Sequence, residues 1–267
     1  MSTTSPTLTG DLRRGDETQV LVALQGDGVQ PEDYAAIGKN NALRSDVVAA
    51  IIKHRLLTPP EEQAKKFLEL NAALWRDPAI TAEVIAALGV PPTCPVSDES
   101  GLYCVALFYD TGDAVETFRR NWEACIQSHG QDGTWKWGGL LFTPEGVRPR
   151  ANAKPRSRGL RWQVCELGRA YQKQSVESVR PQLDRGQIMG MGQEGPMLAA
   201  LHPKWVTSMD GGVIPYMDMP DLEVSPGGGG DFVDAPYLGF VRGDRRVYLD
   251  ADGVREADPG CGSGSLR

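Results

Sequence analysis

The sequence has few histidines and lacks the common catalytic and metal-binding motifs. Only 3 histidines occur among 267 residues, and none stands in a His-Glu-x-x-His or His-x-Glu pattern. The Gly-x-Ser-x-Gly pattern of many hydrolases is absent as well. The 5 cysteines are widely spaced without a Cys-x-x-Cys pair, which argues against a zinc ribbon or a dithiol redox motif. We therefore expect no catalytic residue, no metal and no cofactor.

Long apolar segments and an excess of positive charge are also missing. No apolar stretch approaches the roughly 18 to 20 residues of a membrane helix, and the first residues lack the basic and apolar parts of a secretory signal. The 35 acidic residues outnumber the 28 basic ones, which gives a formal net charge of -7. Binding to nucleic acid depends on many lysines and arginines. We expect a cytoplasmic protein with reduced cysteines, whose partner is neither a membrane nor a nucleic acid.

The composition is otherwise that of a folded globular protein. Hydrophobic residues make up 40% and charged residues 24%, which at this length suits one large domain or two ordinary ones. Changes of pattern along the chain predict four parts. They are a flexible N-terminus at residues 1–17, a helical unit at 18–92, a linker at 93–101 and an α+β domain at 102–267.

Residues 18–92 carry several signals of helices. Pro31, followed by two acidic residues, marks a helix start, and Thr58-Pro-Pro-Glu61 matches a capping box. If the stripe that follows this box were exposed, the helical unit would bind a partner and the protein would be an interaction adaptor. The stripe has a period of 3.6 and consists of Ala64, Phe67, Leu68, Asn71, Leu74 and Trp75.

The part after the linker alternates between strand and helix signals. Asp113 is the predicted cap of a helix whose apolar face carries Val115, Phe118, Trp122 and Ile126. Two further helices are predicted at residues 175–183 and 194–201, and Pro181 is expected to shorten the first. Strands are predicted at residues 102–109, 139–143, 160–165, 236–240 and 246–249.

Glycine is concentrated toward the C-terminus, where 16 of the 31 glycines follow residue 185. Residues 227–230 are consecutive glycines, which predict a turn or a flexible loop. Neither this run nor Gly190-Met-Gly192 continues into Gly-Lys-Ser/Thr, so a phosphate loop is not indicated. Asp250-Ala-Asp252-Gly253 begins like a calcium loop but lacks its later ligands, which favours an ordinary turn. Glycine-rich loops on a rigid scaffold commonly carry binding surfaces.

Six basic residues without an intervening acid lie between residues 148 and 161. Pro149, Pro155 and Gly159 among them favour a solvated connection between two strands. Binding of an anion is the alternative that the sequence leaves open. The six residues are Arg148, Arg150, Lys154, Arg156, Arg158 and Arg161.

Structural roles suffice for the histidines. His54 lies in the predicted helical unit, and His129 and His202 stand at the ends of predicted helices. A helix C-terminus stabilises a protonated imidazole, which accounts for the last two. An enzyme with an unfamiliar site near His202, Asp210 and Cys165 is kept as an alternative.

Two segments resemble a known fold family. Residues 175–186 and 193–203 resemble the helix, glycine turn, short segment and second helix of C-type lectin folds. In that fold a Thr/Ser-x-x-Glu motif opens the second helix. Here Met191-Gly-Gln-Glu194 keeps the glutamate but has methionine in place of the hydroxyl residue. The resemblance implies a C-type-lectin-like domain at residues 102–267, with a twisted antiparallel sheet and two flanking helices.

The C-terminal part is similar to a particular branch of that fold. Residues 234–238 and 243–249 resemble the ends of variable proteins of diversity-generating retroelements, which have a C-type lectin fold of the formylglycine-generating-enzyme type. Those proteins display a mutable ligand-binding surface and often carry a helical N-terminal extension. The chain departs from the pattern in its last residues, Gly262-Ser-Gly-Ser-Leu-Arg267, which lack the expected aromatic-arginine strand.

The resemblance implies a non-enzymatic protein that binds an unknown protein or other macromolecule. The enzymes of this fold use a close pair of cysteines near the C-terminus, and Cys261 stands there alone, so the enzymatic activity is not carried over. The implied ligand-binding surface consists of Tyr237, Gly239, Phe240, Arg242, Asp244, Arg245, Tyr248, Asp250 and Asp252.

Overall fold

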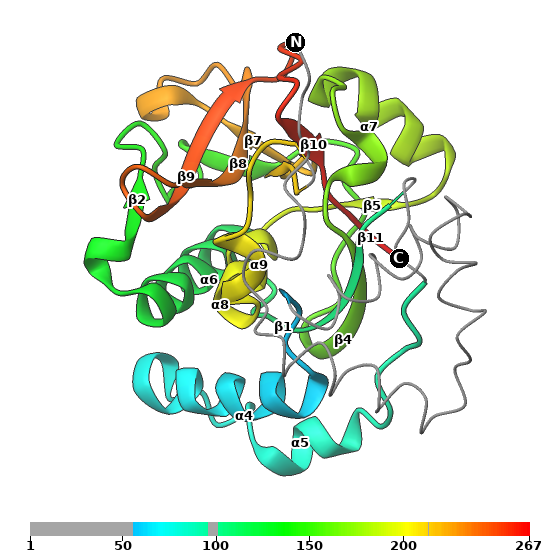
Figure 1. The fold of residues 1–267 in the computed structure, drawn as a ribbon, viewed down its shortest axis with the longest axis vertical. Coiled ribbons are helices and arrows are strands. Elements are labelled where there is room, and N and C mark those ends of the chain that lie inside the picture. Colours follow the sequence, from blue (N-terminus) through cyan, green and yellow to red (C-terminus); the bar gives the residue numbers. More distant parts are fainter. Residues whose placement is uncertain (1–55, 96–100, 213) are drawn as a thin grey trace, which may run out of the picture. The chain divides into compact units, whose positions relative to one another are not determined.

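The computed structural model describes residues 56–95, 101–212 and 214–267, which all belong to one compact unit. These residues combine helices with two β-sheets, in agreement with the predicted α+β class (Figure 1). The helix start at Pro31 and the histidine at position 54 lie outside the described residues. Within the described ranges, the structure contains no helix with the length and apolar character needed to span a bilayer.

The first sheet has four strands in the order β1-β4-β11-β5, and all neighbours are antiparallel. Its two long strands confirm the strands predicted at residues 102–109 and 160–165. The strand bounds are Tyr103–Asp110 for β1, Gly159–Glu166 for β4, Ser265–Leu266 for β11 and Met189–Gly190 for β5.

The second sheet is built around the β8–β9 hairpin, which confirms the strands predicted at residues 236–240 and 246–249. β8 also pairs with β6 and β7, β6 with β10, β7 with β3, and β9 with β2. The strands are β2 (Thr134–Lys136), β3 (Val147–Pro149), β6 (Tyr216–Asp218), β7 (Leu222–Val224), β8 (Asp234–Val241), β9 (Arg246–Gly253) and β10 (Cys261–Ser263).

The prediction of a strand at residues 139–143 is wrong. The chain turns there, because the Leu140 amide donates to the Trp137 carbonyl. Leu140 is fully buried, and Phe142 packs edge-to-face on Phe118 at a centroid distance of 5.3 Å. The apolar run therefore fills the core as a loop, whereas sheet pairing is made by β2 before it and β3 after it.

The central helices occupy the space between the sheets. α6 (Ala114–His129) is capped by Asp113, which accepts from the amides of Val115 and Glu116, as predicted. α8 (Gly195–Leu201) packs against α6 and contacts both β1 and β8, and every one of its residues is buried. α9 (Pro203–Val206) follows directly (Figure 1).

α7 (Val176–Arg185) flanks the sheets and contains Pro181 within its length. The predicted shortening by this proline is therefore wrong. Pro181 and Glu177 are both exposed, so solvent is available to the Glu177 carbonyl that the missing proline N–H leaves unpaired. The helix ends at Arg185, two residues beyond the predicted end, and Gly186 follows as its C-cap.

The described part of the predicted helical unit packs on the open edge of β1. α4 (Pro60–Leu70), η2 (Asn71–Trp75) and α5 (Ala82–Ala87) form this part. The amide of Gln63 donates to the Val105 carbonyl at 2.9 Å, and its oxygen accepts from the Leu107 amide at 3.3 Å. One buried glutamine thus satisfies backbone groups that a neighbouring strand would otherwise pair.

Thr58 does not form the predicted capping box. α4 has no side-chain cap, and the Thr58 hydroxyl donates instead to the Leu201 carbonyl at 2.6 Å. The Thr58 amide donates to Nδ1 of His202 at 3.0 Å. A tertiary contact with the end of α8 has therefore replaced the local cap.

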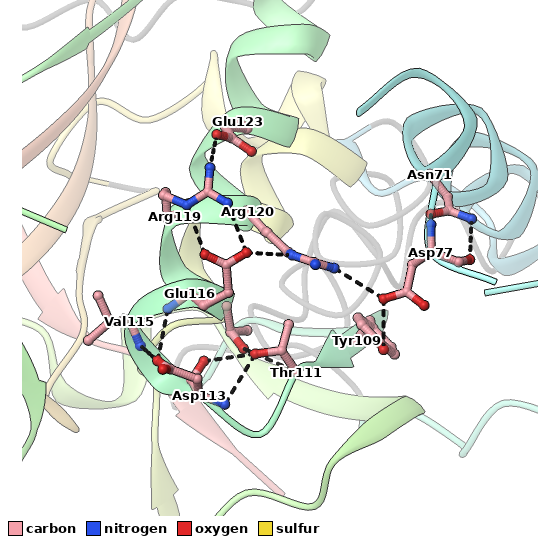
Figure 2. A network of polar contacts seen from close by, with 11 residues as sticks. Asn71, Asp77, Tyr109, Thr111, Asp113, Val115, Glu116, Arg119, Arg120 and Glu123 are labelled. Atoms are coloured by element: carbon pink, nitrogen blue, oxygen red, sulfur yellow. Dashed lines mark hydrogen bonds and ion pairs between the residues drawn. The ribbon is translucent and has the colours of Figure 1, made fainter. Parts of the chain in front are cut away.

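A polar network connects η2 and the segment that follows it to α6 (Figure 2). Asp77 accepts from the Tyr109 hydroxyl at 3.0 Å and lies 3.2 Å from Arg120. Arg120 in turn donates to Glu116 at 2.8 Å. Asn71 holds the Asp77 backbone through its amide and its carbonyl oxygen. These contacts fix the segment after η2 against both β1 and α6.

The basic stretch at residues 148–161 connects β3 to β4, as predicted, and Arg148 and Arg158 are exposed, but the stretch is not solvated throughout. The side chains of Arg150 and Arg156 are only 6% exposed. Arg156 lies between two buried carboxylates, 2.8 Å from Asp221 and 3.3 Å from Glu194. Arg150 donates to Asp221 at 2.7 Å and pairs with Asp184 of α7. Internal carboxylates therefore take the place of an external anion at these two arginines.

Two glycines make room for these ion pairs. A β-carbon on Gly190 would stand 2.7 Å from the Asp221 carboxylate, and one on Gly192 would stand 2.9 Å from the Arg156 guanidinium. Both separations are too short for real atoms. The Gly190-Met-Gly192 pattern thus serves the packing of the buried charges.

We predict that Gln63→Leu lowers the free energy of unfolding by about 2 to 3 kcal/mol, because it leaves the Val105 carbonyl and the Leu107 amide without partners. Chemical denaturation measures the change. Lys65→Leu, on the exposed side of α4, is the matched control and is expected to change stability by about 0.5 kcal/mol or less. Equal effects of the two substitutions would contradict this role of Gln63.

We predict that Arg156→Met destabilises the fold by about 3 to 5 kcal/mol, because Asp221 and Glu194 then lose a shared buried cation. The exposed neighbour Arg158 provides the control Arg158→Met, with an expected change of about 0.5 kcal/mol or less. Thermal and denaturant unfolding of both variants distinguish a structural ion pair from a solvated basic loop.

Candidate functional site

The β8–β9 hairpin has one face toward the core and one face away from it. Directly opposed residues share a face of an antiparallel pair. Leu238 opposes Leu249 on the inner face, and both side chains are fully buried. Tyr237 opposes Asp250, and Gly239 opposes Tyr248, on the other face. Polar and aromatic side chains therefore gather on one side of a hairpin that the core anchors from the other.

Neighbouring strands extend this aromatic surface. β2 places Trp135 beside Tyr248, with ring centroids 4.7 Å apart and ring planes tilted by 34°. β6 places Tyr216 over Gly239, where an added β-carbon would contact the tyrosine ring at 3.4 Å. We define the hairpin face by the six residues Trp135, Tyr216, Tyr237, Tyr248, Asp250 and Asp252.

The structure brings together only some of the residues that the sequence predicted. Tyr237, Gly239, Tyr248, Asp250 and Asp252 share the outer side of the hairpin. Arg242, Asp244 and Arg245 are exposed in the connecting turn, where the Asp244 carboxylate accepts from the Tyr248 hydroxyl at 2.5 Å.

Phe240 belongs to the opposite side of the hairpin. It opposes the buried Val247 and packs against the hydrophobic core. The alternation of β8 and β9 makes this placement unavoidable once Tyr237 faces outward, because residues 237 and 240 differ by an odd number. Phe240 is therefore partly buried, with its ring against the core side of the hairpin.

Sequence reasoning missed Trp135 and Asp218 as members of this region. Trp135 reaches the hairpin through a parallel pairing between β2 and β9, which are about a hundred residues apart and carry no shared motif. Asp218 reaches it through pairing of β6 with β8, opposite Tyr237. No local signal in the sequence announces either contact.

An acidic cavity of about 140 Å³ lies at the end of the hairpin face. Four carboxylates and one thiol line it, together with small apolar side chains and one glycine. We call it the acidic cavity, and its lining is Val176, Asp218, Ala235, Asp252, Gly253, Glu256, Ala257, Asp258 and Cys261.

Asp218 is the most unusual group in the acidic cavity. The residue is 9% exposed, and none of the described residues donates a hydrogen bond to its carboxylate. Burial, followed by the nearby charges of Asp252 and Asp258, raises the pKa of Asp218 to about 7. The pKa of Asp252 is also raised, first by burial and then by Asp250. Within the described residues, none of the four carboxylates of the cavity forms an ion pair with a lysine or an arginine.

Burial is also the largest cause of the pKa shifts of Cys261 and Tyr237, which lie near Asp218. It raises the pKa of the Cys261 thiol, with Asp218 as the next contribution, so this thiol stays protonated at neutral pH. The pKa of Tyr237 is raised by burial and then by Asp250, toward which its hydroxyl points at 3.4 Å. Neither group is set up as a nucleophile or a base.

The residues of the alternative enzymatic site have separate structural partners. His202 is fully buried and accepts at Nδ1 from Thr58, whereas the Asp210 carboxylate accepts from the amides of Gly212 and Ile214. Cys165 lies in β4 opposite Cys104. Among the described residues, no hydrogen bond or ion pair joins any two of the three.

His129 also differs from the expectation. Burial is the largest influence on its pKa and lowers it, although its ring contacts the Ala199 carbonyl at 3.0 Å. The predicted stabilisation of a protonated ring by the helix C-terminus is therefore outweighed. In the part of the chain that the structure describes, no group of three or more histidine, cysteine or acidic side chains is arranged to hold a metal ion.

No protein-family model, curated protein or solved structure matches the chain. The described geometry alone therefore defines the kind of site. It is a partly exposed sheet face with aromatic rings and carboxylates, next to a small cavity of unneutralised negative charge.

We predict that Asp218→Asn stabilises the folded protein in a pH-dependent way. The pKa is about 7 in the fold and near 3.8 in the unfolded chain, so the native state holds the proton more tightly. In the wild type, the protonated Asp218 contributes fully to the free energy of unfolding below about pH 4. This contribution falls as the pH rises to about 7, and it is absent at higher pH. The advantage of the variant should grow across that window, to at most about 4 kcal/mol.

Denaturant unfolding at pH 4, 6 and 8 measures this difference. The exposed Asp231 provides the control Asp231→Asn, which removes the same charge away from the acidic cavity. An advantage of Asp218→Asn that is independent of pH would show that the carboxylate does not titrate near neutrality.

Proposed function

We propose that the protein is a non-enzymatic binding protein that contacts a macromolecular ligand through the hairpin face and the turn at residues 242–245. The observation that carries this proposal is the two-sided character of the β8–β9 hairpin. Leu238, Val247 and Leu249 are buried on one side, whereas polar and aromatic side chains line the other. Side chains on the outer side can therefore change without altering the core.

The chemistry of the hairpin face suits recognition. Tyrosine and tryptophan offer large contact areas with little rotamer freedom to lose, and they are enriched where proteins bind each other. Trp135 and Tyr248 already hold each other in place, so less entropy is lost when a ligand covers them. The strand that carries Tyr248, β9, pairs with β2 on one side and with β8 on the other, which keeps this part of the surface rigid.

We further propose that the fold is C-type-lectin-like and that the protein is similar to variable proteins of diversity-generating retroelements. The order of α7, Gly186, β5 and α8 along the chain supports this, because it follows the helix, glycine turn and second helix of the family. The return of the last strand, β11, to the sheet that contains β1 supports it too. The variable positions would be those of the hairpin face and its turn, without Phe240.

The adaptor alternative has less support. The stripe on which it depends turns inward, since Phe67 is fully buried and Leu68, Leu74 and Trp75 pack against the core. The same packing explains why these residues repeat with a helical period.

We predict that the outer positions of the hairpin tolerate substitution and that the inner ones do not. Tyr248→Ala and Asp250→Ala should each change the free energy of unfolding by about 1 kcal/mol or less. Leu238→Ala and Leu249→Ala should each lower it by about 2 to 5 kcal/mol, because they open cavities in the core. Equal sensitivity on both sides would contradict a display surface.

Comparison of sibling genes tests the proposed class. A reverse transcriptase gene and a near-identical template repeat should lie beside the gene. Substitutions should occur at template adenines and concentrate in the codons of the hairpin face and turn, while the codons of Leu238 and Leu249 stay constant. Absence of the repeat, together with evenly spread variation, would remove this assignment.

A further inference from the structure

The acidic cavity has an opening, a charge and an unsatisfied group that the fold itself does not explain. Asp218 points a nine-tenths buried carboxylate into it without a hydrogen-bond donor among the described residues. Buried carboxylates in proteins are normally paired with a cation or with donors. Elsewhere in the same domain, Asp221 follows that rule, because its two carboxylate oxygens pair with Arg150 and Arg156. The contrast indicates that a cation from outside completes the Asp218 site.

We propose that the acidic cavity binds a primary alkylammonium group, such as the side-chain end of a lysine. This deepens the proposed function, on which it rests, because Asp252 belongs to both the hairpin face and the cavity lining. The ligand that covers the hairpin face would insert one ammonium group beside Asp218.

The lining favours an ammonium group over a metal ion. No three acidic, cysteine or histidine side chains of the described residues are arranged to ligate a metal together. An ammonium group needs only spaced acceptors for its three N–H donors, which Asp218, Asp252 and Asp258 supply. Metal coordination instead requires several oxygens at fixed short distances.

Size and apolar contacts agree with a single functional group on an alkyl chain. The cavity volume of about 140 Å³ is well below the roughly 300 to 1,000 Å³ of sites for whole drug-sized ligands. Val176, Ala235 and Ala257 contribute apolar surface beside the carboxylates. Methylene groups next to the ammonium would contact these side chains.

Binding should depend on pH through the groups that face Asp218 of β6. These are Tyr237 from β8, Asp252 from β9, Glu256 and Asp258 from the segment after β9, and Cys261 from β10. An alkylammonium keeps its proton well above neutral pH. With an Asp218 pKa of about 7, the ionised fraction rises about tenfold between pH 6 and pH 8. Affinity should rise by about the same factor.

Calorimetric titration of the full chain with N-acetyl-lysine methylamide tests the proposal. N-acetyl-norleucine methylamide, which has the same carbon chain without the ammonium, is the control probe. We expect the lysine probe to bind at least about tenfold more tightly. Asp218→Asn should weaken it about tenfold or more, while Asp231→Asn should leave it unchanged. Asp252→Asn is the second variant, should Asp218→Asn fail to fold by circular dichroism.

The remaining probes separate the sources and the competing ions. Similar affinity for n-butylamine would assign the site to free amines, whereas a preference for the lysine probe would assign it to a protein ligand, and both support an ammonium site. Tighter binding of agmatine or of calcium chloride would overturn it. So would equal binding of the norleucine probe, or no binding of the lysine probe at about 10 mM.

Failure of this inference is distinguishable from failure of the proposed function. If the lysine probe does not bind while the outer hairpin positions still tolerate substitution, only the ammonium site is lost. If it binds but Tyr248→Ala and Asp250→Ala unfold the protein, the cavity stands alone and the display surface is lost.

Discussion

Arg156 and its two carboxylates hold together parts of the chain that local structure leaves separate. Glu194 stands at the start of α8, Asp221 lies between β6 and β7, and Arg156 belongs to the connection before β4. Arg150 and Arg161 extend the contacts to Asp184 of α7 and to β4. The separate transfer of any one of these charges from water would be strongly unfavourable. Their burial therefore ties the two sheets and both helices into one arrangement.

This buried network explains why the hairpin face can be polar. The β8–β9 hairpin is anchored by its inner residues and by pairing with β2, β6 and β7, and the ion pairs fix the neighbouring β6–β7 turn. On its outer side, Tyr237, Tyr248 and Asp250 stay partly exposed and Asp252 is exposed. Gln63 likewise satisfies buried backbone groups with one side chain, because its amide group bonds both the Val105 carbonyl and the Leu107 amide at the edge of β1. Asp218 stands out against both cases, because its carboxylate has no such partner among the described residues.

Local patterns predicted those elements whose cause is local. The Asp113 cap, the strand at β4 and the two strands of the hairpin follow from backbone propensity and residue type, and each was confirmed. Errors arose where a distant segment decided the outcome. Residues 139–143 have the composition of a strand but fill the core as a loop. Thr58 caps no helix, because its hydroxyl donates to the Leu201 carbonyl and its amide donates to His202. Phe240 was grouped with exposed residues although the period of two places it inside.

The sequence by itself determined the α+β class, the hairpin and the lack of common catalytic motifs, because these depend on residue type and on spacing within a few turns of chain. The tertiary structure decided which charges are buried. It buried Arg150 and Arg156 of the basic stretch in internal ion pairs. It also brought Trp135 to the hairpin and Asp218 to the acidic cavity. The physical reason is that the state of a charge or ring depends on solvent exposure and on neighbours from distant segments. Such long-range contacts leave no periodic trace in a single sequence.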